Sequence, residues 1–176
     1  MLSSMKSKLT LEIEQKLIKK YKDTSFRYAL EVNIHDGRGN YGIADFVAVQ
    51  HNGEWGMPDV VVYEIKVSID DFKSQNGHNL YGDENYYVMP VSLWEEILLK
   101  NANLLGHDVG VYVYSPTSKR LTLKRTQSPH YLRYQKRLRI EDRFYLMDQI
   151  LMRWINGSMS TTTVEGEQDE SSEEVL

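Results

Sequence analysis

The sequence predicts an α/β fold, in which helices flank a mixed sheet that contains an antiparallel meander of three strands. The main observation is that residues 26–34 place apolar side chains at every second position, while residues 42–50 and 60–67 are rich in β-branched and other apolar residues. Short loops separate these three segments, as expected for antiparallel neighbours. The second observation is the four-residue spacing of apolar side chains over residues 8–22, which predicts an amphipathic helix before the meander.

Further helices and strands are predicted after the meander. Ser68 with Asp71, and Ser92 with Glu95, resemble capping boxes, and each pair predicts the start of a helix. The other expected elements are a strand over residues 85–90, a hairpin of residues 109–115 and 120–125, and a last helix that starts at Ser128 and Pro129 and ends at Gly157.

Size and composition limit the class of protein. The 176 residues suffice for one domain with a sizeable core, and 41% hydrophobic and 26% charged residues are ordinary values for a globular protein. No apolar run approaches the roughly 18 residues of a membrane span, and the first residues lack the apolar block of a signal peptide. Cysteine is absent, which excludes disulfides and thiolate metal sites. We expect a cytoplasmic, intracellular protein.

Charge is distributed unevenly along the chain. From Asn156 onward the sequence holds six of the 25 acidic residues and no basic residue, which leaves 19 acidic against 21 basic residues before it. This composition predicts a folded domain over residues 1–156 and a disordered acidic tail over residues 157–176. Within the domain, residues 119–143 contain nine Lys or Arg and only two acidic residues.

The third strand of the meander carries two charges on an apolar background. Glu64 and Lys66 project from the same face of the strand, ~6.5 Å apart along it. Charges on a buried strand are costly unless they are paired or hold a ligand. A structural ion pair and a binding site are therefore both consistent with this strand alone.

Symmetric hairpins would align carboxylates across the three strands. They place Asp45 opposite Glu64 and Glu31 opposite Asp45, with Cβ atoms ~4.5–5.5 Å apart. Such a row repels itself and suits a hard cation such as Mg²⁺ or Mn²⁺. Lys66 would then stabilise the charge of an attacking hydroxide or of a phosphorane-like transition state. A lone strand Glu more commonly faces solvent, which is the alternative for Glu31.

An Asp on the second strand, followed by Glu-x-Lys on the third and then a helix, resembles the PD-(D/E)XK nucleases of the restriction-endonuclease-like fold. More narrowly, the chain resembles the MmcB-type DNA-repair proteins and related phage and bacterial proteins. The residues that carry this resemblance are Glu31, ADFVAV at 44–49, YEIKVSIDDF at 63–72, His78, Tyr81 and NYYVMP at 85–90.

The resemblance implies a role for each matching residue. Asp45, Glu64 and the carbonyl of Ile65 would be metal ligands, Lys66 the catalytic lysine and Glu31 the strand-one Glu of the narrower family. The superfamily more often takes its extra carboxylate from the first helix, where the candidates are Glu12 and Glu14.

The sequence departs from the family pattern at one position and offers one false match. Ala44 replaces the proline of the family pattern, which removes no ligand. A literal Pro58–Asp59 occurs, but Asp59 lies ~16 Å along the strand from Glu64 and on its opposite face, so the two cannot share a metal.

Several basic residues are candidates for nucleic-acid contacts. Lys73 and His78 follow the Glu-x-Lys strand, and Arg133 and Arg137 belong to the basic region with tyrosines interleaved. A solvated helix face or an ordinary surface histidine is the alternative for each. We therefore predict a Mg²⁺- or Mn²⁺-dependent nuclease that hydrolyses DNA, with RNA as another substrate to test. The alternative is a catalytically inactive nuclease-fold domain that binds nucleic acid or acts as a scaffold.

Overall fold

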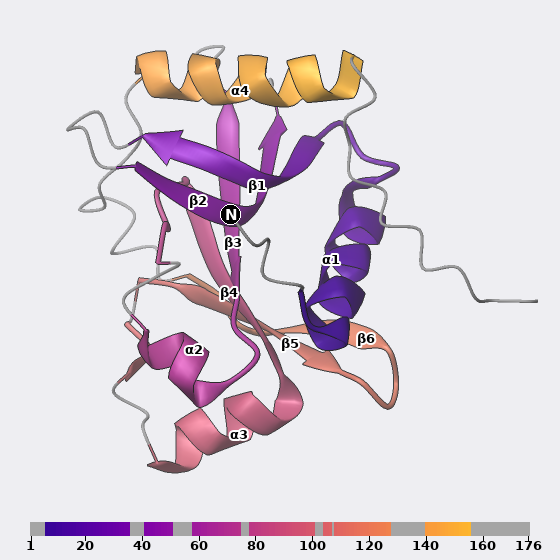
Figure 1. The fold of residues 1–176 in the computed structure, drawn as a ribbon, viewed down its shortest axis with the longest axis vertical. Helices are drawn as coiled ribbons and strands as arrows, with labels where there is room; N and C mark the ends of the chain where they lie inside the picture. The colour runs from indigo at the N-terminus through magenta and orange to yellow at the C-terminus, as the bar shows by residue number, and fades with distance from the viewer. Residues whose placement is uncertain are drawn as a thin grey trace, which may run out of the picture.

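A six-stranded mixed sheet lies at the centre of the protein, with helices on both faces (Figure 1). The computed structural model describes residues 6–35, 41–50, 58–74, 78–100, 104–106, 108–127 and 140–155. Within these ranges the strands are β1 (Arg27–His35), β2 (Tyr41–Gln50), β3 (Asp59–Ile65), β4 (Glu84–Pro90), β5 (Gly110–Ser115) and β6 (Arg120–Arg125). The helices are α1 (Lys8–Tyr21), α2 (Ile69–Lys73), α3 (Val91–Lys100) and α4 (Ile140–Ile155).

The strands lie in the sheet in their sequence order. β1, β2 and β3 pair antiparallel, which confirms the predicted meander. β3, β4 and β5 are parallel, with α2 and α3 as their crossovers, and β6 returns antiparallel to β5 as the predicted hairpin. The fold is therefore α/β with a mixed sheet, as the sequence predicts.

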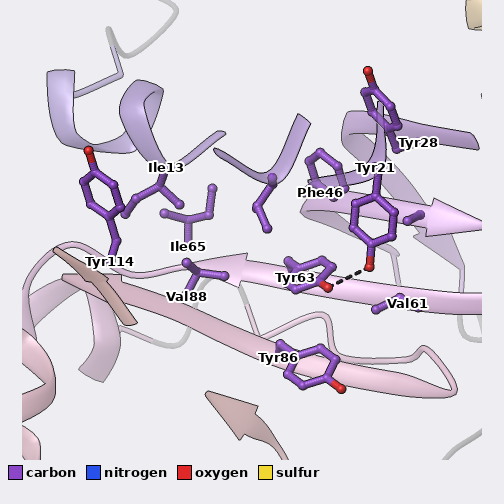
Figure 2. Close-up of a cluster of buried hydrophobic side chains, with 12 residues drawn as sticks. Ile13, Tyr21, Tyr28, Phe46, Val61, Tyr63, Ile65, Tyr86, Val88 and Tyr114 are labelled. Atoms are coloured by element: carbon purple, nitrogen blue, oxygen red, sulfur yellow. Dashed lines mark hydrogen bonds between the residues drawn. The ribbon is translucent and has the colours of Figure 1, made fainter. Parts of the chain in front are cut away.

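One face of the sheet packs against α1. Ile13, Leu17 and Tyr21 of this helix share a buried cluster with side chains of five strands, among them Tyr63 and Ile65 of β3. Figure 2 shows Ile13 above Ile65, and the hydroxyls of Tyr21 and Tyr63 joined by a hydrogen bond of 2.7 Å. This contact places the first helix directly over the end of the strand that carries Glu64.

The opposite face is covered by three helices. Leu146 and Ile150 of α4 are buried against apolar residues of β1, β2 and β3, while α2 and α3 cover β4 and β5. α4 lies across the end of the sheet formed by the meander, and α2 and α3 lie at the other end (Figure 1). Phe144 of this helix is 42% exposed, because Leu146 and Ile150 face the sheet instead.

Capping residues were predicted correctly for one of two helices. The Ser68 hydroxyl accepts a hydrogen bond from the Asp71 amide at 3.1 Å, as a helix N-cap does. The second prediction was wrong, since α3 begins at Val91, directly after Pro90, and Ser92 is its second residue. The proposed start of the last helix at Ser128 lies outside the described residues.

A local irregularity interrupts β1 at Glu31. Its backbone has a φ of 52°, a left-handed conformation that is uncommon for a side chain of this size. Leu30 faces α1, whereas Ala29 and Val32 both face α4, so the alternation of the strand changes at this residue. Arg153 of α4 donates hydrogen bonds to the carbonyls of Leu30 (2.6 Å) and Glu31 (3.3 Å), which holds the irregular segment in place.

Over the part of the chain that the structure describes, none of the helices combines the length and apolar character required to cross a membrane.

Candidate functional site

Asp45 and Glu64 meet where β2 and β3 stop pairing. The last ladder pair is Phe46 with Tyr63, so the same register continues to Asp45 and Glu64, as symmetric hairpins predict. The Asp45 carboxylate (Oδ2) then accepts a hydrogen bond from the Ile65 amide at 2.7 Å, in place of a backbone acceptor. Burial raises the pKa of Asp45, and the Ile65 amide and the Lys66 ammonium partly offset this increase.

Glu64 is fully buried and only partly satisfied. Its Oε1 accepts a hydrogen bond from the Asn79 amide at 3.1 Å, whereas Oε2 has no hydrogen-bond partner among the residues described. Burial, and then the neighbouring Asp45, raise the pKa of Glu64 to about 8. Buried carboxylate oxygens are normally paired, so this one has an unused capacity to bind a proton or a cation.

Lys66 follows β3 directly and is also buried. Its backbone amide donates to the Val88 carbonyl (2.9 Å), which keeps the segment beside β4 after the strand ends. Its ammonium lies 3.6 Å from a carboxylate oxygen (Oδ1) of Asp71. The other oxygen of Asp71 accepts from the Val67 amide at 3.2 Å, so the start of α2 fixes the chain beside this lysine.

A second group of charges lies beside Asp45. Glu14 of α1 is 4% exposed, and burial raises its pKa. The Lys6 ammonium opposes this increase, whereas the carboxylates of Asp45 and Glu31 add to it. The Lys6 ammonium lies 2.6 Å from Glu14 and 2.7 Å from Glu31, and so bridges the two carboxylates.

Glu31 does not sit in the sheet as the predicted row of carboxylates requires. The flanking pairs, Leu30 with Phe46 and Val32 with Ala44, have the predicted register, but Glu31 itself forms no ladder pair. Its side chain is 59% exposed and is bound by Lys6, because the irregular backbone turns it out of the regular alternation. Glu31 therefore borders the site from the solvent side.

Of the two helix carboxylates left open by the sequence, only Glu14 lies beside Asp45. Glu12 instead accepts hydrogen bonds from the Tyr114 hydroxyl (2.8 Å) and the Lys119 ammonium (2.9 Å). These contacts connect α1 to the β5–β6 hairpin. Glu12 therefore has a structural role, and Glu14 is the buried carboxylate that α1 brings to the site.

No three side chains of His, Asp or Glu form a group that could hold a metal ion within the described ranges. One observation nevertheless fits a metal cation at this place, namely the unpartnered, buried oxygen of Glu64. The Lys6 ammonium already neutralises two of the surrounding carboxylates, Glu14 and Glu31. The donor set consists of carboxylate oxygens, which suits Mg²⁺ or Mn²⁺.

The predicted nucleic-acid contacts fall in different places. Lys73 is exposed on α2. His78 is exposed too, and its ring joins two neighbours: Nε2 donates to the Ser74 carbonyl (2.9 Å), so Nδ1 accepts from the Tyr87 hydroxyl (2.6 Å). Arg133 and Arg137 lie outside the described residues.

Two other arginines of the basic region are structural. Arg125 donates to the carbonyls of Gly106 and Val109, at 2.8 and 2.7 Å from Nη2. Arg143 is buried and donates to the carboxylate of Asp83 and to the Pro58 carbonyl (2.9 Å from Nη1). Part of the basic cluster in the sequence therefore stabilises the fold.

Sequence reasoning missed Lys6 and Asn79. Nothing in the local sequence marks either, because each acts on residues distant in the chain. Asn79 donates from its side chain to the Ile43 carbonyl (2.9 Å) and from its backbone to Glu64, which links the loop before β4 to β2 and β3. Glu14 had a weak signal, since it lies next to Ile13 on the helix face that Ile13, Leu17 and Tyr21 bury.

Comparison with protein-family models finds no match to this chain, and comparison with curated proteins finds none either.

Proposed function

We propose that this protein is a metal-dependent nuclease that hydrolyses DNA phosphodiester bonds and has the restriction-endonuclease-like form of the α/β fold. The observation that carries the proposal is the buried Glu64, with an unpartnered oxygen, beside Asp45 and two residues before a buried lysine. A structural ion pair would leave no such oxygen. Perturbed, incompletely paired carboxylates are typical of functional sites.

The arrangement of strands supports the same proposal. An antiparallel meander follows a first helix, and a short helix follows the third strand, which is the order that the resemblance to PD-(D/E)XK nucleases implies. Asp45 lies on the second strand, Glu64 on the third and Lys66 directly after it. By the same resemblance, DNA repair or phage and bacterial DNA processing is the process we propose.

Each residue has a role that follows from its position. Asp45, Glu64 and the Ile65 carbonyl would hold Mg²⁺ or Mn²⁺, and Glu14 and Glu31, which share the Lys6 ammonium, would lie beside the metal. The bound cation would supply charge neutralisation at the phosphate and activation of water. Lys66, held near Asp71 in a buried position, would stabilise negative charge that develops at the phosphorus. Lys73, His78, Arg133 and Arg137 are proposed to contact the phosphate backbone.

The test is cleavage of single-stranded, duplex, flapped and branched DNA, and of RNA, with Mg²⁺ or Mn²⁺. We expect Asp45→Asn, Glu64→Gln and Lys66→Met each to lower the rate at least ~100-fold, because each removes a charge used in the reaction. Asp59→Asn is the matched control, since Asp59 is exposed near the start of the same strand. The proposal fails if no substrate is cleaved, or if the three variants cleave like wild type.

The second candidate is a catalytically inactive domain that binds nucleic acid or acts as a scaffold. It is favoured by the finding that no three His, Asp or Glu side chains form a metal-binding group within the described residues. Calorimetry with Mn²⁺ separates the two. Mn²⁺ binding that Asp45→Asn abolishes favours the nuclease, whereas salt-sensitive DNA binding without Mn²⁺ binding favours the scaffold.

A further inference from the structure

Lys6 places a positive charge inside the carboxylate cluster. Its ammonium lies within 2.7 Å of both Glu14 and Glu31, and its side chain is 32% exposed. Burial opposes this charge, but the two carboxylates outweigh that effect and raise the pKa of Lys6. The ammonium is therefore a firmly held cation.

The carboxylates of the cluster fall into two pairs. Asp45 and Glu64 lie where the pairing of β2 and β3 ends, and they accept hydrogen bonds from the Ile65 and Asn79 amides. Glu14 and Glu31 are joined to each other by Lys6. The first pair has the unpartnered oxygen, and the second pair already has a cation.

We infer that Lys6 serves as a built-in second cation, so that the protein binds one divalent cation, at Asp45 and Glu64, and none at Glu14 and Glu31. The inference rests on the metal site of the proposed function and fixes its metal count. It follows from geometry: Glu14 is 4% exposed and the Lys6 ammonium lies 2.6 Å from its carboxylate, so a cation from within the chain already balances this buried charge. Only the Asp45–Glu64 pair is left for an ion from solution.

The first experiment counts bound Mn²⁺ by calorimetry and by electron paramagnetic resonance. Wild type is expected to bind one Mn²⁺ per chain. Lys6→Met is expected to bind two, with the spectral signature of coupled ions, because the variant leaves Glu14 and Glu31 without a cation. Lys6→Arg should keep one. Lys8→Met is the matched control, as Lys8 is an exposed lysine close by in the chain.

Three results are distinguishable. Two Mn²⁺ in wild type, or one in Lys6→Met, overturns the role of Lys6 and leaves the proposed metal site standing. No Mn²⁺ in wild type refutes the metal-dependent function and this inference with it. One Mn²⁺ in wild type and two in Lys6→Met would support both the proposed metal site and the role of Lys6.

A second measurement uses wild type alone, in case Lys6→Met does not fold. Acetylation of Lys6 is followed by mass spectrometry with and without saturating Mg²⁺. If Lys6 stays between Glu14 and Glu31 when the metal binds, its acetylation rate should change by less than about twofold. A several-fold acceleration would show that the metal displaces Lys6, which contradicts the inference.

Discussion

The two ends of β3 both bring carboxylates and cations together, but only one end satisfies all of their polar atoms. At the start of the strand, Asp83 accepts hydrogen bonds from Arg143 through both oxygens and from the Val60 amide at 2.9 Å, and Arg143 also binds the Pro58 carbonyl. At the end of the strand, Glu64 is more deeply buried and has one oxygen without a partner among the described residues.

This difference separates a structural ion pair from a candidate site. When every polar atom of a buried ion pair has a partner, the hydrogen bonds and the opposite charge offset the cost of removing the charges from water. When a carboxylate is only partly paired, its pKa rises instead. The first arrangement is expected to matter for stability and not for metal binding. The second is expected to reduce the stability of the metal-free protein and to be required for metal binding.

The largest loss of stability is expected from breaking the paired end. Arg143→Met leaves Asp83 without its cation, and we expect a loss of about 3 kcal/mol in the free energy of unfolding, or roughly 6–12 °C in Tm. Urea unfolding measures it, with Arg120→Met, an exposed arginine of β6, as control. Mn²⁺ affinity should stay within about twofold. A stability loss as small as that of the control would show that the pair is not structural.

The next effect is a gain of stability when Glu64, at the end of β3, is replaced by Gln. The pKa of Glu64 is about 8 in the folded protein against 4.5 for an ordinary Glu, so ionisation of Glu64 destabilises the folded state. This loss of stability is absent below pH ~4.5, grows as the pH rises and is complete above pH ~8. Gln cannot ionise. Glu64→Gln should therefore stabilise the metal-free protein by a few kcal/mol at pH 9 and have little effect at pH 4.5.

Urea unfolding in chelator from pH 4.5 to 9 measures this slope. Wild type should lose stability relative to Glu64→Gln across the range, and saturating Mn²⁺ should restore wild type only. Asp45 and Glu14, whose pKa values are also raised, should leave a residual slope in the variant. Parallel curves for wild type and Glu64→Gln would contradict the assignment of Glu64 as the strained carboxylate.

The smallest effect is expected from the loop that supports Glu64. Asn79→Ala removes the side-chain hydrogen bond to Ile43 but keeps the backbone bond to Glu64, so we expect a loss of about 1 kcal/mol in stability and a several-fold weaker Mn²⁺ affinity. Asn33→Ala, at an exposed position of β1, is the control. Unchanged Mn²⁺ affinity would show that Asn79 does not position Glu64.

Local sequence patterns were sufficient for the strands and for the register of the meander. Apolar runs and alternation depend on near neighbours in the chain, and the register 46–63 follows from hairpins that are symmetric about their loops. The same geometry distinguishes Asp45, which reaches the Ile65 amide, from the exposed Asp59 at the start of the strand.

The partners of charged side chains depended on packing between distant segments. The sequence left the additional carboxylate open between Glu31 and a glutamate of the first helix. In the structure Glu31 has a left-handed backbone conformation and is 59% exposed, whereas Glu14 is buried. Arg143 and Arg125 looked like part of a basic surface, yet they bind a carboxylate and carbonyls inside the fold.

The sequence by itself therefore determined the α/β class, the order of the meander and the placing of Asp45 beside Glu64, because period and loop length are local properties. Only the tertiary structure decided that Glu14 is the helix carboxylate at the site, that Lys6 neutralises it and that Asn79 holds Glu64. The physical reason is that a buried charge takes whatever partner packing brings within about 3 Å, and packing joins residues far apart in the chain.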